Sequence, residues 1–105
     1  MFLIQILLPA SAAPAHERGG IARTRAELVE RYGGVTAYTQ TPAEGEWRAP
    51  DGRVAEDTVA LVEVVAPAFD REWWSRYART LARRFSQEAV HIRALHIELL
   101  DPESA

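Results

Sequence analysis

The sequence contains no cysteine and only one methionine among its 105 residues. Without cysteine it has no disulfide framework, no thiolate metal site and no thiol nucleophile, and this pattern fits the reducing cytosol. The sequence also lacks a large excess of charge of either sign, because 12 basic residues are interleaved with 15 acidic ones. A nucleic-acid-binding protein needs a basic face. We therefore predict a cytoplasmic protein that has no nucleic-acid partner.

Long hydrophobic runs are missing as well. The apolar stretch Phe2–Leu8 is interrupted by Gln5 and ended by Pro9. It is too short to cross a bilayer as a helix, and no Lys or Arg precedes it as in a signal peptide. A buried strand fits it better, so we predict no membrane segment. The length and composition predict a single domain over residues 1–105, with a polar tail at 101–105.

Hydrophobic periodicity and turn residues divide the chain into six elements. The predicted strands are Phe2–Leu8, Val35–Gln40, Asp57–Val65 and Ala89–Leu99, and the predicted helices are Ile21–Tyr32 and about Asp70–Ser86. The small-residue segment Ala10–Gly20 is predicted to be a flexible connection. Pro50-Asp51-Gly52 predicts a hairpin turn, because Pro presets its backbone angle and Gly accepts a positive φ.

The second helix has the clearest signals. Asp70 is its predicted N-cap, and Phe69 and Trp74 have the spacing of a hydrophobic staple. A wide apolar stripe follows at helical spacing, made of Trp74, Tyr77, Ala78, Leu81 and Phe85. In the first helix the predicted stripe is narrower and comprises Leu28, Val29 and Tyr32, with Gly33 as the left-handed residue that ends the helix.

The element order β-α-β-β-α-β defines the predicted fold. Each βαβ half of the chain makes a right-handed crossover, and a strand of the other half lies between its two strands. The result is a four-stranded antiparallel sheet of order 4-1-3-2 with both helices on one face. We predict this α+β, ferredoxin-like sandwich.

Strand parity predicts a mixed surface on the uncovered face of the sheet, because side chains alternate between the two faces. Gln5, Tyr38, Glu63 and Arg93 are predicted to form a polar row there, among leucines and valines. An apolar patch of that size is seldom left open in a monomer. We therefore predict that a second copy of the chain covers it in a two-fold homodimer, a ligand occupies it, or both.

Three interpretations of the polar row remain open. It binds a small polar ligand; or Glu63, His91 and Tyr38 transfer protons in catalysis; or Glu63 and Arg93 form an ion pair that supports a dimer interface. Trp47, in the hairpin, is a candidate lid over the face or an anchor at the dimer contact. His91 and His96 lack the spacing of metal ligands, and we predict neither a metal site nor a cofactor.

Several stretches resemble a small family of uncharacterised bacterial proteins. They are Arg31-Tyr32-Gly33-Gly34-Val35-Thr36-Ala37, Pro42-Ala43-Glu44-Gly45 with Trp47, Trp73-Trp74, and Arg83-Arg84-Phe85 with Gln87-Glu88 and Ile92-Arg93-Ala94. The resemblance implies no activity. At the level of the fold alone, the chain is similar to dimeric α+β barrel proteins, which include small monooxygenases and isomerases.

The sequence thus predicts a small cytosolic homodimer that binds a metabolite at the open sheet face through Gln5, Tyr38, Trp47, Glu63 and Arg93. Two alternatives stand beside it. One is a cofactor-free enzyme of the α+β barrel type, and the other is a non-catalytic module that binds another protein.

Overall fold

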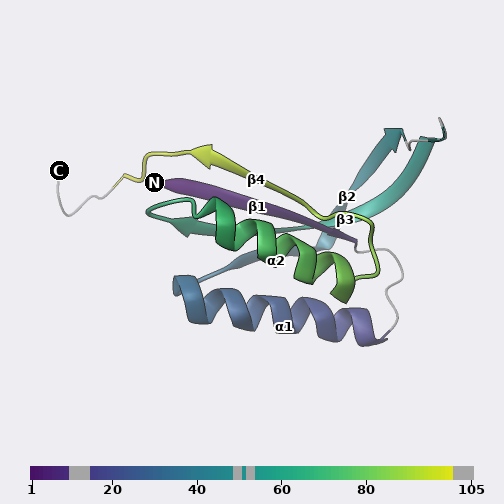
Figure 1. Cartoon of the computed structure of the whole chain (residues 1–105), viewed down its shortest axis with the longest axis horizontal. Helices are drawn as coiled ribbons and strands as arrows, with labels where there is room; N and C mark the ends of the chain where they lie inside the picture. The colour runs from purple at the N-terminus through teal and green to yellow at the C-terminus, as the bar shows by residue number, and fades with distance from the viewer. Residues whose placement is uncertain (10–14, 49–50, 52–53, 101–105) are drawn as a thin grey trace.

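A computed structural model of the chain describes residues 1–9, 15–48, 51 and 54–100, and for 15–19, 39–48 and 54–58 it describes the backbone alone. The elements are β1 (Phe2–Pro9), α1 (Ala15–Tyr32), β2 (Thr36–Arg48), β3 (Val54–Ala66), α2 (Arg71–Arg84) and β4 (His91–His96). The strands form one antiparallel sheet of order β2-β3-β1-β4, and both helices lie on one side of it (Figure 1). The predicted ferredoxin-like sandwich is confirmed.

The core lies between this sheet and the two helices, as strand parity requires. Ile4, Ile6 and Leu8 of β1 are fully buried, and so are the corresponding residues of β3. Helix α2 contributes Trp74, Tyr77 and Leu81 to the core, and Phe85 follows the helix into it. Four of the five residues in the predicted α2 stripe are therefore buried, and Ala78 is half-buried.

The start of α2 follows its sequence signals. The side chain of Asp70 accepts a hydrogen bond from the backbone N–H of Trp73 at 3.0 Å, which satisfies one of the open donors of the first turn. The rings of Phe69 and Trp74 stack with centroids 6.5 Å apart, so the predicted staple is present. The start of the helix is thus fixed by local contacts as well as by the core.

The end of α2 is a Schellman motif with serine in the left-handed position. Ser86 has φ 54°, the Ser86 N–H donates to the carbonyl of Arg83, and the Gln87 N–H donates to the carbonyl of Ala82. A side chain with a Cβ costs about 1 kcal/mol in this conformation, and glycine avoids the cost. The equivalent position after α1 is Gly33, with φ 82°, as predicted.

We therefore expect Ser86→Gly to raise the free energy of unfolding by about 0.5–1 kcal/mol. Chemical denaturation of the two proteins measures the difference. Ser86→Ala is the matched control, because it removes the hydroxyl and keeps the Cβ; it is expected to leave stability unchanged or slightly lower. A gain of stability in the alanine variant as large as that in the glycine variant would contradict the backbone explanation.

Helix α1 begins six residues before the predicted start, so the predicted flexible connection 10–20 is helical over residues 15–20. Gly19 and Gly20 made this segment look like a loop. In the structure Gly20 is buried, and a Cβ placed on it would lie 3.2 Å from two ring atoms of Phe85. The glycine lets the first turns of α1 approach Phe85 closely. Residues 10–14 lie outside the described part of the chain, as does the predicted tail 101–105.

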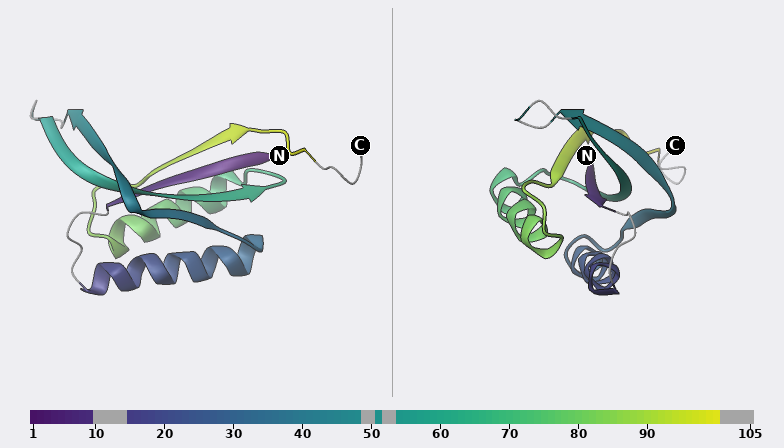
Figure 2. Two further views of the ribbon diagram at one scale, coloured as in Figure 1. Left: turned by 180° about the vertical axis from the view of Figure 1, so that it is seen from behind. Right: turned by 90° about the vertical axis from the view of Figure 1, so that its right-hand side faces the viewer.

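Three strands extend beyond their predicted ends: β1 by one residue, and β2 and β3 by several. Strand β2 was expected to end before Pro42, but it continues to Arg48, which pairs with Val54 of β3. Most of the predicted turn Pro50-Asp51-Gly52 lies outside the described residues. From Tyr38 to Ala43, β2 advances five residues while β3 covers only two, from Leu61 to Val59. This bulge accommodates Pro42, which has no N–H to donate and lies on an edge strand. The far part of the hairpin bends away from the helices, toward the other side of the sheet (Figures 1 and 2).

Strand β4 is shorter than predicted and ends at His96, because its partner β1 begins at Phe2. One further bond, from the Ile97 N–H to the Met1 carbonyl at 3.1 Å, extends the pairing. His96 falls on the helix side by parity, but it lies at the end of the strand, is exposed and packs on the Phe2 ring with centroids 4.4 Å apart. Ending the strand there keeps a polar ring out of the core.

Candidate functional site

The face of the sheet opposite the helices, here called the open face, carries rows of side chains that run across the strands. Read from β4 towards β2, three successive rows are Leu95–Leu3–Val65, Arg93–Gln5–Glu63–Thr36 and His91–Leu7–Leu61–Tyr38. The middle row, called the polar row from here on, is polar, and the rows on either side are mainly apolar. The register thus places the predicted polar residues Gln5, Glu63 and Arg93 side by side.

The middle row is joined by two short hydrogen bonds through Gln5. The guanidinium Nε of Arg93 donates to Gln5 Oε1 at 2.7 Å, and Gln5 Nε2 donates to Glu63 Oε2 at 2.7 Å. Within one chain, Glu63 and Arg93 are therefore joined through Gln5, and the predicted ion pair at a dimer interface stays a prediction. Both residues pair with Gln5 from opposite sides, and neighbouring strands lie about 4.8 Å apart, so a glutamine amide fills the gap between the two charges.

Tyr38 belongs to the third row but reaches diagonally to Glu63. A hydrogen bond with Glu63 raises the pKa of the Tyr38 phenol above its ordinary value of 10, and the negative charge of the carboxylate adds to the effect. The phenol therefore stays protonated at neutral pH and donates to the carboxylate. In this arrangement Tyr38 is suited to donate a hydrogen bond and unsuited to act as a base.

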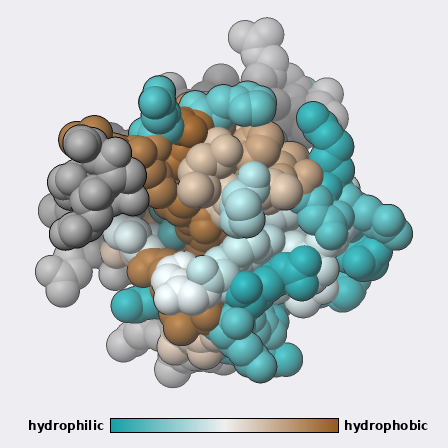
Figure 3. Space-filling view, turned by 90° about the vertical axis from the view of Figure 1, so that its left-hand side faces the viewer, coloured by the Kyte–Doolittle hydropathy of each residue, from teal (hydrophilic) through white to brown (hydrophobic). Residues whose placement is uncertain are grey.

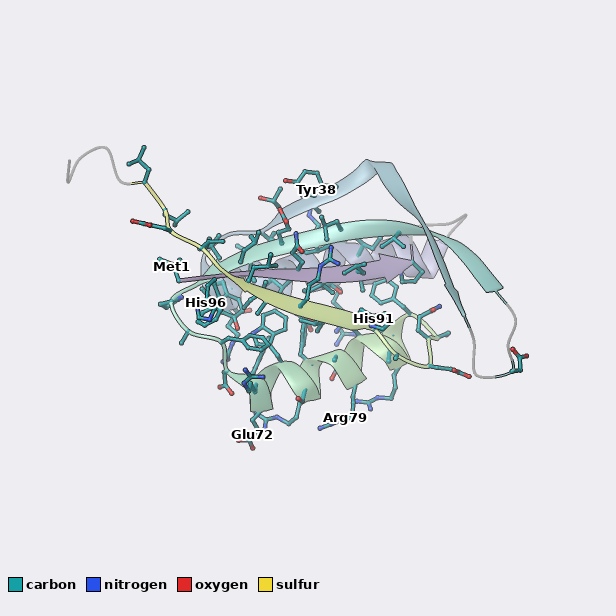
Figure 4. The ribbon with its side chains drawn as sticks, turned by 90° about the horizontal axis from the view of Figure 1, so that it is seen from above. Met1, Tyr38, Glu72, Arg79, His91 and His96 are labelled. Atoms are coloured by element: carbon teal, nitrogen blue, oxygen red, sulfur yellow. The ribbon has the colours of Figure 1, made fainter. Side chains whose placement is uncertain are left out.

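His91 is not brought to Glu63 or to Tyr38. It lies on β4 in the third row, whereas Tyr38 lies on β2 at the other margin of the open face (Figure 4). Three strand spacings separate the two backbones, or about 14 Å. The proton-transfer set proposed from the sequence therefore reduces to Glu63 and Tyr38.

Trp47 is placed far along the hairpin. Its backbone pairs with Ala55, eight residues along β3 from Glu63, and its side chain lies outside the described part of the structure. At 3.3 Å per residue the separation along the strand is about 26 Å. The backbone of Trp47 is thus not beside the polar row of the same chain.

Several apolar side chains of the open face are in contact with solvent. Val65, Leu95 and Tyr38 are 38%, 44% and 48% exposed. Figure 3 views the end of the molecule where β1 begins and β3 and β4 end, and hydrophobic surface shows there among hydrophilic residues. Met1 and Leu99, also exposed, lie near this end. In a single chain the apolar first row is therefore only partly covered.

A second polar cluster, which sequence reasoning missed, lies between the two helices. The guanidinium of Arg84 binds both carboxylate oxygens of Glu27, at 2.7 and 3.0 Å, and also donates to the Thr24 hydroxyl at 2.7 Å. The Tyr77 hydroxyl donates to the same carboxylate at 2.9 Å. The Thr24 hydroxyl in turn donates to the Gly20 carbonyl at 2.7 Å. This cluster joins α1 to α2.

Its electrostatics follow from these contacts. The hydrogen bonds from Arg84 lower the pKa of the Glu27 carboxyl below its ordinary value of 4.5, although partial burial opposes them. Burial and the bond to Glu27 raise the pKa of the Tyr77 phenol. We interpret the cluster as structural, because the Arg84 side chain is only 10% exposed and each polar group in it has a partner within the cluster.

The sequence held a signal for this cluster. Arg84 follows Tyr77 by seven residues and Leu81 by three, so helical periodicity places it on the buried stripe of α2. Its neighbour Arg83 is exposed. Adjacent arginines at the end of α2 thus have different surroundings. Val29, predicted in the α1 stripe, is 45% exposed.

No group of three or more His, Cys, Asp or Glu side chains among the described residues is arranged to hold a metal ion. None of the helices in that part of the chain combines the length and apolar character needed to span a bilayer.

Comparison with known proteins identifies the class of fold. No protein-family model matches the chain, and no curated protein matches it. Among solved structures it is similar to a divalent cation tolerance protein (Cut A1) from Thermus thermophilus, with a TM-score of 0.63 over 99% of this chain and 91% of that chain. The two sequences are 20% identical, so the likeness shows a shared ferredoxin-like α+β fold. The predicted family of uncharacterised bacterial proteins is not confirmed.

Proposed function

We propose that copies of the chain associate through the open face and bind a small metabolite at its polar row. The observation that carries the proposal is the exposed apolar first row directly beside a preorganised line of polar groups. An apolar surface of this kind is favourably removed from water by a partner, and a two-fold homodimer is the simplest closed arrangement. The partner would also shield the polar row from water and strengthen its hydrogen bonds to a ligand.

Association is tested with a pair of matched lysine variants. Leu95 on the open face and Val29 on α1 are 44% and 45% exposed, so both substitutions place a charge at a similarly accessible position. Leu95→Lys would bury an unpaired ammonium in the contact, and we expect the dissociation constant of the assembly to rise about 100-fold. Val29→Lys is expected to leave it unchanged.

Sedimentation velocity at several protein concentrations measures both variants and the original chain. A monomer at all micromolar concentrations would contradict self-association and favour the alternative of a module that binds a different protein. If the two lysine substitutions raise the dissociation constant equally, the open face is not the contact between the copies.

The proton-transfer alternative is less well supported by the geometry. It needs a base beside an acid, but His91 lies apart and the Tyr38 phenol has a raised pKa. The cation tolerance in the name of the structural neighbour concerns that protein. A binding role for the row therefore remains the proposal of choice.

A further inference from the structure

Toward the described residues, the polar row has unused hydrogen-bonding capacity at both ends. A guanidinium carries five N–H donors, and Arg93 uses its Nε for Gln5. A carboxylate has about four acceptor positions, and Glu63 accepts from Gln5 and from Tyr38. The row therefore presents donors with positive charge on the β4 side and acceptors with negative charge on the β3 side.

Gln5 shows which chemical group spans the gap between these ends. Its amide places an acceptor towards Arg93 and a donor towards Glu63, with a 2.7 Å bond on either side. Two bonds of this length joined through one amide leave Arg93 Nε and Glu63 Oε2 at most about 8 Å apart. A ligand group above the row has to present an acceptor and a donor at similar spacing and in the same order.

An α-amino acid head group meets this requirement. Its carboxylate and ammonium are attached to one carbon, so an anionic acceptor and a cationic donor lie about as close together as the two polar atoms of an amide. The carboxylate would bind the terminal nitrogens of Arg93, and the ammonium would bind the carboxylate of Glu63. In each of these bonds both partners carry a charge, whereas in the bonds to Gln5 only one partner does, so the bonds to the ligand are stronger.

The rows beside the polar row set the preference for the rest of the ligand. Leu3, Leu95 and Val65 lie on one side, and Leu7 and Leu61 lie on the other. A side chain that leaves the head group in either direction meets apolar surface, and its burial there is favourable. We infer that the open face binds zwitterionic α-amino acids with apolar side chains. This inference rests on the proposed function and specifies its ligand.

The test compares leucine with three relatives that each lack one part. These are 4-methylpentanoate without the ammonium, 3-methylbutylamine without the carboxylate, and glycine without the apolar side chain. Isothermal titration of the full chain is expected to show leucine binding about tenfold or more tightly than each relative, because each lacks one charged bond or the apolar contact.

Variants locate the site. Arg93→Gln and Glu63→Gln are each expected to weaken leucine binding about tenfold. Arg79→Gln and Glu72→Gln change the same residue types on exposed positions of α2 and are expected to leave binding unchanged (Figure 4). The exchange Arg93→Glu with Glu63→Arg reverses the row, and a zwitterion can turn round to fit it. Binding lost in Arg93→Glu alone should therefore return in the double variant.

The outcomes separate this inference from the function on which it depends. If leucine and one singly charged relative bind equally tightly, and a change of Arg93 or Glu63 abolishes that binding, the requirement for a zwitterion is wrong. The open face would then still hold a metabolite site. Leucine binding that is insensitive to both residues would overturn the location. A lack of binding by all four compounds in a chain that still associates through Leu95 would overturn the amino-acid ligand and leave the assembly intact.

Discussion

Arg84→Ala is expected to lower the free energy of unfolding by about 2–3 kcal/mol, or the midpoint of thermal unfolding by about 10 °C. Arg84 makes two bonds to Glu27 and one to Thr24 at the seam between the helices. Without Arg84, the partly buried carboxylate of Glu27 loses two hydrogen bonds and the positive charge beside it. The expected effect is below that of a fully buried pair, because the Glu27 side chain is 36% exposed.

Arg83→Ala provides the matched control, since the neighbouring arginine is exposed and its removal is expected to change stability by less than about 0.5 kcal/mol. Thermal and urea unfolding of both variants measure the difference. Equal losses from the two substitutions would mean that helix propensity or net charge, and not the cluster, is responsible.

The pH dependence gives the Arg84 prediction a second readout. The pKa of Glu27 is lower in the folded chain than its ordinary value of 4.5, so its contribution is fully present above pH 4.5. It is lost as the pH falls through the folded value. The Arg84→Ala variant lacks the main cause of this shift, and its stability should therefore fall less steeply below pH 4.5 than that of the original chain.

Trp74→Ala is expected to cost about 3–5 kcal/mol, whereas Trp74→Phe is expected to cost less than half as much. Trp74 is 2% exposed and packs against Tyr32, Trp73 and Tyr77. Alanine leaves a large cavity among these rings. Phenylalanine keeps most of the aromatic contacts and leaves a smaller one.

The indole nitrogen explains the tolerance of phenylalanine. Trp74 Nε1 is buried and has no hydrogen-bond partner among the described residues, which costs about 1–3 kcal/mol relative to a paired or solvated N–H. Replacing the indole by a phenyl ring removes this unpaired donor, and the relief offsets part of the lost packing. Urea denaturation compares the three proteins. Similar losses for phenylalanine and alanine would show that the indole shape, or an interaction of its N–H, is required.

The contacts around Trp74 also show why a neighbour in the sequence has a different role. Trp73 is half-buried, and the guanidinium of Arg31 lies 4.0 Å from its ring centroid. Helical periodicity separates the two tryptophans, because adjacent residues on a helix point about 100° apart. The sequence was therefore sufficient to assign Trp74 to the core. The contact between Trp73 and Arg31 could not be assigned in this way, because it depends on how α1 and α2 lie relative to each other.

For the sheet, the sequence determined the parity of each central strand, and with it the fold. Ile4, Ile6 and Val62 face the helices and Gln5 and Glu63 face away because alternation is a local property of an extended backbone. Helix ends at Asp70 and Gly33 were equally local. The length of β2 was not, because Pro42 ends a strand unless a bulge and a paired neighbour accommodate it.

Which side chains meet one another depends on how the sheet and the helices pack. Gln5 separates Arg93 from Glu63 because antiparallel register aligns all three, and one residue of slip would have moved the glutamine to the other face. Arg84 reaches Glu27 because the two helices lie side by side on the sheet. Periodicity assigns a residue to a face from its own neighbours in the chain. The partner on that face comes from a distant segment, and its identity is fixed only when the sheet and helices pack.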